Sequence, residues 1–173
     1  TQKVSLVDFN RSGVPLIEIV TEPDIKSAAQ AKEYAKTLRG ILRELHIADC
    51  DMEQGGMRLE ANISLQAVGT KELPNYKIEL KNINSFRFLE QAINYEIERQ
   101  SQALQNGEQL NQETRGWNTA QNKTFLQRTK EEAEDYRYFP DPDLPPIRLS
   151  TNQIELIKQN LPELPLERAK RWM

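Results

Sequence analysis

Residues 57–65 alternate apolar and polar side chains without a break, which restricts this segment to one kind of structure. The apolar set is Met57, Leu59, Ala61, Ile63 and Leu65, and the polar set is Arg58, Glu60, Asn62 and Ser64. A period of two residues places these sets on opposite faces of a β-strand. The segment therefore predicts a strand with one buried face and one polar face.

Residues 77–81 repeat the pattern after a polar linker, with apolar Ile78 and Leu80 between the charged residues Lys77, Glu79 and Lys81. We predict that the two strands pair antiparallel, so that their polar rows lie side by side on one face of a sheet. An ordinary half-exposed sheet has a solvated polar face without any function, and alternation alone favours that interpretation. The mixture of carboxylates, cations and an amide is also the chemistry of a site for metal ions and phosphate.

A third run, residues 14–20, is apolar almost throughout and has Glu18 in its middle. This composition predicts a strand that is buried on both sides. A carboxylate in such a strand must be paired, hydrogen-bonded or bound to a cation, because an unpaired buried charge is strongly destabilising. Glu18, Glu60 and Glu79 are therefore predicted to form an oxygen cluster for a hard cation such as magnesium.

The remaining pattern predicts an α+β fold with a mainly antiparallel sheet and flanking helices. One helix is expected to begin at Ser27, where Gln30 would complete a capping box, and a second to run over 85–105 and end at Asn106-Gly107. Further strands are predicted at 4–9, 109–117 and 123–129, and two short helices at 153–159 and 166–172. Short strands interrupted by only two long helices are typical of the α+β class.

Composition excludes several classes of protein. At 173 residues the chain suits one domain, and its net charge of −3 is unlike the basic surface of a stand-alone nucleic-acid binder. Cys50 is the only cysteine, which rules out a disulfide framework and a zinc site built from cysteines. No apolar run approaches the ~20 residues that cross a bilayer, so we expect a cytoplasmic protein without membrane contact. Neither a P-loop nor a Rossmann glycine pattern occurs in the sequence.

Several long motifs resemble those of a known family. The two longest are LVDFNRSGVPLIEIVTEPD at 6–24 and DYRYFPDPDL at 135–144, and shorter ones lie at 58–64, 79–88 and 112–115. Together they resemble the B subunit of the tRNA-dependent amidotransferase, in the family's order and spacing, from about residue 4 to the end of the chain. This resemblance assigns 1–150 to the C-terminal part of a catalytic cradle domain and 151–173 to the start of a helical domain. It also implies a core similar to that of glutamine synthetase and the guanidino kinases.

The resemblance implies a carbon–nitrogen ligase that uses ATP and magnesium. In this family the B subunit phosphorylates the side-chain carboxylate of glutamate or aspartate mischarged on tRNA(Gln) or tRNA(Asn). The amidase, which is the A subunit, releases ammonia from glutamine to form the amide, and the small C subunit bridges the other two. Phosphoryl transfer of this kind needs positioning and charge neutralisation rather than a protein nucleophile.

The resemblance also implies roles for single residues. Glu18 and Glu79 are expected to bind magnesium, Arg58 and Lys81 to neutralise phosphate, and Asn62 to orient a ligand. Asn10 and Arg11 are expected to contact nucleotide or acyl phosphate, although a purely structural turn explains them equally well. Glu60 stands where the family carries aspartate, so its direct ligation of the metal stays open. Two further ligand segments of the family are not in this sequence, and we expect these residues alone to bind magnesium–ATP weakly and to catalyse nothing.

Three alternatives stay open at this point. The first is the archaeal-type amidotransferase protein, which acts on glutamyl-tRNA alone with a different amidase partner. The second is a stand-alone carboxylate–amine ligase of the same fold. The third is a non-catalytic scaffold whose sheet charges only dock the amidase.

Overall fold

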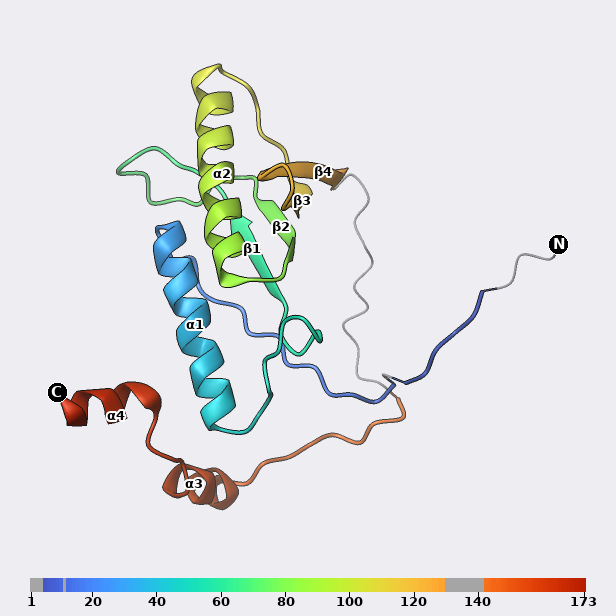
Figure 1. Ribbon diagram of the computed structural model, residues 1–173, viewed down its shortest axis with the longest axis vertical. Coiled ribbons are helices and arrows are strands. Elements are labelled where there is room, and N and C mark those ends of the chain that lie inside the picture. The colour runs from blue at the N-terminus through green and yellow to red at the C-terminus, as the bar shows by residue number, and fades with distance from the viewer. Residues whose placement is uncertain (1–4, 11, 130–141) are drawn as a thin grey trace.

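The computed structural model describes residues 5–10, 12–129 and 142–173, and its helices and strands are labelled in Figure 1. In chain order the elements are α1 (Ala28–Glu44), β1 (Leu59–Ile63), β2 (Ile78–Ile83), α2 (Phe86–Gln105), β3 (Glu113–Asn118), β4 (Lys123–Thr129), α3 (Thr151–Gln159) and α4 (Pro165–Trp172). The α+β class is therefore confirmed.

The four strands form one mixed sheet in the order β1-β2-β3-β4. The predicted β1–β2 pair is antiparallel, with Asn62 opposite Glu79. β3 pairs parallel to β2, and β4 pairs antiparallel to β3. The prediction of a mainly antiparallel sheet is thus wrong, because α2 connects β2 to β3 and carries the chain back so that both strands run in the same direction.

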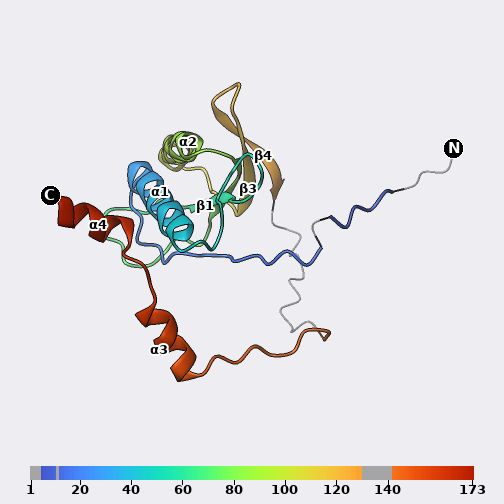
Figure 2. The same cartoon turned by 60° about the horizontal axis from the view of Figure 1, so that its bottom comes forward.

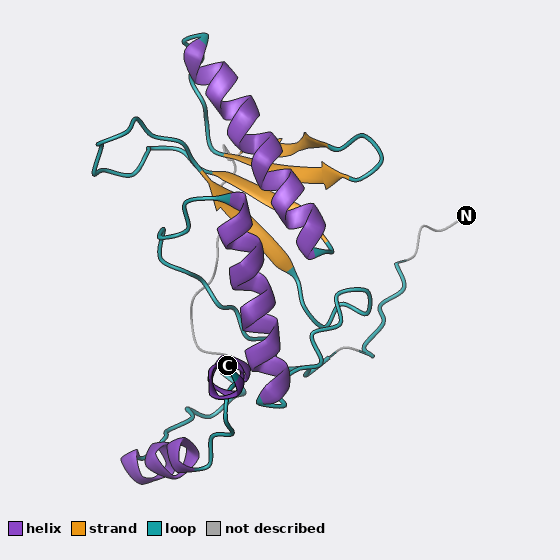
Figure 3. Cartoon of the chain, turned by 60° about the vertical axis from the view of Figure 1, so that its left-hand side comes forward, coloured by secondary structure: helices purple, strands orange, loops and turns teal. Residues whose placement is uncertain are grey.

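Helices α1 and α2 lie side by side over the same face of the sheet (Figure 3). The core between them contains Ile78 and Leu80 of β2, both 0% exposed, together with Trp117 of β3. α1 contributes small side chains to this core, Ala28, Ala31 and Ala35, which allow its backbone to approach α2. The alternation in the sequence therefore predicted the buried face of β2 correctly.

The helix ends follow the sequence signals with one correction. Ser27 caps α1 by accepting a hydrogen bond from the backbone N–H of Gln30, at 3.2 Å. The Gln30 side chain accepts from the backbone of Lys26 instead of Ser27, so the predicted capping box is incomplete. α2 ends as predicted: Gly107 has φ +76°, and the backbone N–H of Glu108 donates to the carbonyl of Ala103, as in a Schellman motif.

The described residues of the two N-terminal runs, 5–9 and 14–20, form no strand, so both strand predictions are wrong in this structure. They follow an extended path that leads away from the sheet (Figure 1), and Leu16 is 91% exposed. A strand requires a neighbour that supplies backbone hydrogen bonds. The four strands described here pair only with one another, and none of them pairs with this segment. Its apolar composition is therefore not sufficient to make it a strand.

The two short helices predicted near the C-terminus are confirmed as α3 and α4. α4 lies beside α1, where Arg168 donates to the carboxylate of Glu44, whereas α3 lies apart from the sheet (Figure 2). Within the described residues, no helix combines the length and the apolar character that a bilayer crossing would need.

Candidate functional site

The charged rows of β1 and β2 share one face of the sheet, as the alternation predicts. Asn62 and Glu79 are directly opposite in the β1–β2 ladder, and Glu79 is opposite Thr114 in the β2–β3 ladder. Because Ile78 and Leu80 are buried against the helices, the residues between and beside them point to the other side. We call this side the polar face; its members are Glu60, Asn62, Glu79, Lys81 and Thr114.

Lys81 lies between the two acids of the polar face. Its ammonium nitrogen is 3.7 Å from Oε1 of Glu79 and 3.8 Å from Oε1 of Glu60. The Glu79 side chain is 15% exposed and the Glu60 side chain 48% exposed, so the cluster lies partly in solvent. Partly exposed ion pairs of this kind contribute only about 0–1 kcal/mol to stability.

A β-bulge brings Lys81 to this position. Leu59 pairs with Ile83 and Ala61 with Leu80, so both Lys81 and Asn82 stand opposite the single residue Glu60. Asn82 adopts φ +62°, and its side-chain amide donates to the carbonyl of Trp117 at 3.0 Å. Asparagine is one of the few residues that occupy this left-handed conformation readily. Alternation alone could not predict the bulge, because it is set by how the strands pair.

Glu79 is held from its other side by β3. The hydroxyl of Thr114 donates to Oε2 of Glu79 at 2.7 Å, and Nε of Arg128 donates to the same hydroxyl at 3.3 Å. Thr114 is 1% exposed, although it belongs to the polar face. Neither Thr114 nor Arg128 was predicted as a site residue from the sequence. The available signal was the alternation in β3, where apolar Trp117 fixes which face Thr114 occupies.

The predicted cluster of three carboxylates is only partly formed. Glu18 lies in the exposed N-terminal segment rather than in a buried strand, so the prediction that burial forces it to pair is wrong. Across residues 5–10, 12–129 and 142–173, no three His, Cys, Asp or Glu side chains are grouped closely enough to hold a metal ion. Glu60 and Glu79, the two acids beside Lys81, carry oxygen atoms of the kind that magnesium prefers as ligands.

The other predicted site residues fall into two groups. Arg58 is exposed and directly precedes β1, and Asn62 is exposed within β1. Both therefore lie at the β1 edge of the sheet, next to the other members of the polar face. Asn10 lies in an exposed turn of the N-terminal segment, where its backbone N–H donates to the carboxylate of Asp8 at 2.9 Å. Arg11 is outside the described residues. The structure thus brings Arg58, Glu60, Asn62, Glu79 and Lys81 into one region, whereas Asn10 and Glu18 lie in the exposed N-terminal segment outside the sheet.

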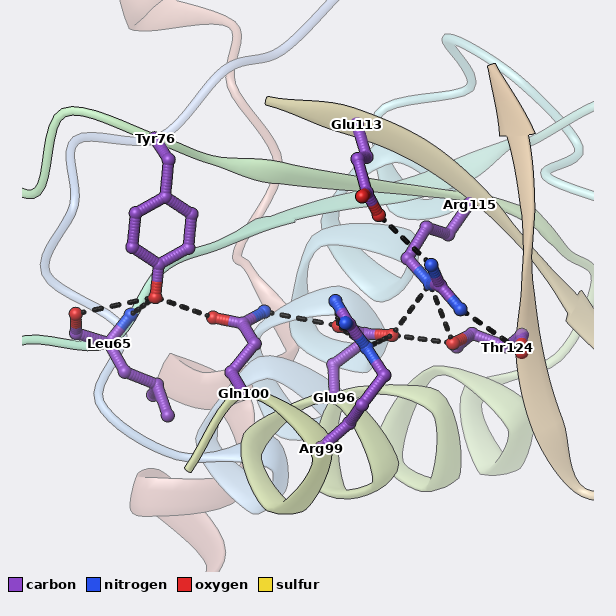
Figure 4. Close-up of polar contacts among 8 residues, drawn as sticks. All are labelled: Leu65, Tyr76, Glu96, Arg99, Gln100, Glu113, Arg115 and Thr124. Atoms are coloured by element: carbon purple, nitrogen blue, oxygen red, sulfur yellow. Dashed lines mark hydrogen bonds and ion pairs between the residues drawn. The ribbon is translucent and has the colours of Figure 1, made fainter. Parts of the chain in front are cut away.

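A second polar cluster is buried on the opposite, helix-covered face and is drawn in Figure 4. Its centre is Glu96 of α2, which is 0% exposed. The Glu96 carboxylate accepts hydrogen bonds from Arg99 at 2.8 Å and from the hydroxyl of Thr124 at 2.5 Å. It also lies 3.2 Å from Nε of Arg115, which pairs with Glu113 as well. We call Glu96, Arg99, Gln100, Arg115 and Thr124 the buried network.

The buried network connects α2 to both edges of the sheet, to β4 through Thr124 and to the segment after β1 through Tyr76. The Gln100 amide donates to Glu96 at 3.2 Å, and the hydroxyl of Tyr76 donates to the Gln100 carbonyl oxygen at 3.1 Å. Tyr76 in turn accepts from the backbone N–H of Leu65, just after β1. Burial alone would raise the pKa of Glu96, but the hydrogen bonds from Arg99 and Thr124 and the charge of Arg99 outweigh it, and the pKa lies below its usual value. Glu96 is therefore ionised although it is fully buried.

The sequence contained a signal for this network. Glu96 and Gln100 fall on the same helical stripe as Leu89, Ala92 and Ile93, at spacings of three and four residues. A polar residue on an apolar stripe must be paired inside the protein. The helix over 85–105 was predicted, but Glu96 and Gln100 were not recognised as buried polar residues.

Comparison with known proteins identifies the family. The family model described as "GatB/GatE catalytic domain" matches residues 1–155. The chain is 53% identical over 169 residues to a protein of Persephonella marina, and 52% identical over 168 residues to one of Crocosphaera subtropica. A protein of Bdellovibrio bacteriovorus is 49% identical over 168 residues. Each of the three is named as the B subunit of an aspartyl/glutamyl-tRNA(Asn/Gln) amidotransferase.

The match extends over nearly the whole chain but only part of each relative. It covers 98% of this chain and 35% of the Persephonella protein, and 97% of this chain with 34% and 35% of the other two. The chain therefore spans about a third of the length of these relatives. With a family model that covers most of its residues, the chain belongs to the GatB/GatE catalytic-domain family.

Proposed function

We propose that the polar face takes part in the ATP-dependent activation of a side-chain carboxylate of glutamate or aspartate carried by tRNA. The activity is proposed for the full-length protein, as a carbon–nitrogen ligase of protein synthesis. The observation that supports it most is the grouping of Glu60 and Glu79 around the ammonium of Lys81, at distances of 3.8 and 3.7 Å. A face that mixes oxygen ligands with a cation suits the handling of phosphate groups.

The proposed reaction has two steps. A carboxylate oxygen of the substrate attacks the γ-phosphorus of ATP, the bond to the bridging oxygen breaks, and ADP leaves with the electron pair. Ammonia then attacks the carboxyl carbon of the acyl phosphate, and inorganic phosphate leaves as the amide forms. Both steps concentrate negative charge on phosphate oxygens, so cations in fixed positions lower the barrier.

Residues of this chain would serve these steps through charge and orientation. Lys81 and Arg58 would bind phosphate oxygens, and Asn62 would orient a ligand through its amide. Magnesium, when bound, would neutralise phosphate charge, and Glu79 with Glu60 are the described residues that would hold it. Asn10, Arg11 and Glu18 remain proposed contacts that would require the N-terminal segment to approach the polar face.

The wider assignment rests on the family. We propose the glutamine synthetase-like core, the division of the chain near residue 150, and a cytoplasmic heterotrimer in which this protein joins the amidase and the small bridging protein. Glutamine would be the ammonia source, and mischarged Glu-tRNA(Gln) and Asp-tRNA(Asn) the substrates. The names of the relatives, which include both aspartyl and glutamyl, favour this bacterial type over the archaeal glutamyl-tRNA-only type.

Replacing Lys81 by methionine tests the proposal, because it removes the charge and keeps the length of the side chain. We expect phosphate release from ATP to fall about tenfold or more, which corresponds to roughly 1.4 kcal/mol of transition-state stabilisation. The assay uses the full-length protein with its amidase partner, mischarged tRNA and labelled ATP. Lys71→Met, in an exposed loop, is the matched control. Unchanged phosphate release by Lys81→Met would favour the docking-scaffold alternative.

A further inference from the structure

We propose that Thr114 is a positioning residue that fixes the orientation of the Glu79 carboxylate on the polar face. The inference rests on the proposed function and adds a residue to it that lies beneath the ligand-binding surface. Thr114 does not touch the proposed ligands, since it is 1% exposed, and it acts through Glu79.

The direction of the Thr114 hydroxyl follows from its two partners. A threonine hydroxyl has one proton to donate and two lone pairs that accept. Arg128 can only donate, and its Nε lies 3.3 Å from Oγ1, so it occupies a lone pair. The proton is then directed to Oε2 of Glu79 at 2.7 Å, a distance typical of a charge-assisted hydrogen bond.

This bond makes the two oxygens of Glu79 unequal. Oε2 is held by the neighbouring strand, whereas Oε1 is the oxygen that lies 3.7 Å from the Lys81 ammonium. The parallel register places Glu79 directly opposite Thr114, so the backbone of the sheet enforces the contact. A glutamate with one oxygen anchored loses its rotational freedom before any ligand arrives, which is the condition for a preorganised ligand group.

A second hydrogen bond between a threonine and a glutamate lies on the opposite, helix-covered face of the sheet, where it belongs to the buried network. Thr124 is 4% exposed, and its hydroxyl donates to the buried carboxylate of Glu96 at 2.5 Å. Thr114 and Thr124 are thus both buried threonines of adjacent strands, each bonded to a glutamate. Only the Thr114 pair includes a member of the proposed site, so Thr124→Val is a matched control for Thr114→Val.

The test measures binding and activity in the full-length protein with its amidase partner. Calorimetry gives the dissociation constant for magnesium with a non-hydrolysable ATP analogue, and phosphate release gives the magnesium concentration at half-maximal rate. We expect Thr114→Val to raise both by about 10- to 100-fold, the usual effect of losing a group that orients a metal ligand.

Thr114→Ser, which keeps the hydroxyl, should restore most of the loss. Thr124→Val should lower the melting temperature and leave the dissociation constant unchanged. Thr114→Ala replaces Thr114→Val if the valine variant does not fold.

Any of three results would overturn the inference. Thr114→Val could bind with the wild-type dissociation constant, Thr114→Ser could raise that constant as much as Thr114→Val does, or Thr124→Val could raise it to the same extent. Glu79→Gln, measured in parallel, separates this failure from failure of the proposed function. If Glu79→Gln abolishes activity while Thr114→Val binds as the wild type does, only the positioning role is wrong. If Glu79→Gln is also harmless, the proposed site itself is wrong.

Discussion

Glu79→Gln is expected to lower both ATP-dependent phosphate release and amide formation by about 100-fold or more, the scale on which a preorganised electrostatic group acts. The substitution keeps the shape of the side chain and its capacity to accept from Thr114, but it removes the charge. Glu79 is the less exposed of the two acids of the polar face, at 15%, and it contacts both Lys81 and Thr114. The measurement uses labelled ATP, mischarged tRNA and free ammonia, so that the amidase reaction does not limit the rate.

The control for Glu79→Gln is Glu98→Gln, which makes the same charge change at an exposed position of α2. Assembly with the amidase partner and binding of tRNA should persist in both variants. A non-catalytic docking scaffold predicts the reverse pattern, in which Glu79→Gln weakens assembly and leaves phosphate release intact. That outcome would reject the catalytic assignment of the polar face.

Glu96→Gln is expected to destabilise the fold by about 3 kcal/mol at neutral pH, because it removes the buried negative charge that Arg99 and Arg115 share. Arg99 and Arg115 are only 24% and 13% exposed in their side chains, and both contact the Glu96 carboxylate. Glutamine can still bond Thr124, so the expected loss comes from the charge rather than from packing. Glu90→Gln offers a comparison on the same helix, since its ion pair with Lys32 is 28% exposed on both sides and should contribute about 0–1 kcal/mol.

The effect of Glu96→Gln should depend on pH in a defined direction. Because the pKa of Glu96 is lowered in the folded protein, the unfolded chain binds its proton more readily than the folded chain. The ionised carboxylate therefore stabilises the fold above its ordinary pKa, and this contribution is lost as the pH falls toward the lower folded value. The stability difference between wild type and Glu96→Gln should be largest at about pH 7 and shrink at about pH 3.5.

Urea unfolding followed by tryptophan fluorescence measures this difference. Trp117 lies in the core at 1% exposure, whereas Trp172 is 75% exposed, so a Trp172→Phe background leaves the core tryptophan as the reporter. A destabilisation that stays constant from neutral to acidic pH would contradict the role assigned to the Glu96 charge.

The sequence predicted the local features of this fold well, because they depend on short-range physics. Alternation in 57–65 and 77–81 predicted β1 and β2, and their pairing set Asn62 opposite Glu79. A helix over 85–105 was predicted, and the Asn106-Gly107 signal predicted the C-terminal end of α2. These patterns depend only on neighbouring residues.

The errors concern features that depend on distant parts of the chain. Residues 14–20 have the composition of a buried strand, but a strand forms only beside a partner that the composition of the run does not identify. The parallel pairing of β3 with β2 and the bulge at Lys81 and Asn82 likewise arise from how the strands are brought together. For the same reason the sequence suggested Glu79 as a candidate site residue but gave no indication of the Thr114 hydroxyl that donates to it.

The most direct test of the central claim follows an oxygen atom from the substrate to the released phosphate. The side-chain carboxylate of tRNA-bound glutamate is labelled with oxygen-18, and the full-length protein with its amidase partner is supplied with ATP, magnesium and ammonia. If the carboxylate attacks the γ-phosphorus, each phosphate released during amide formation carries one labelled oxygen, and Glu79→Gln slows the appearance of that labelled phosphate. Amide formation with unlabelled phosphate would contradict carboxylate phosphorylation, and labelled phosphate at the wild-type rate from Glu79→Gln would contradict its assignment to the polar face.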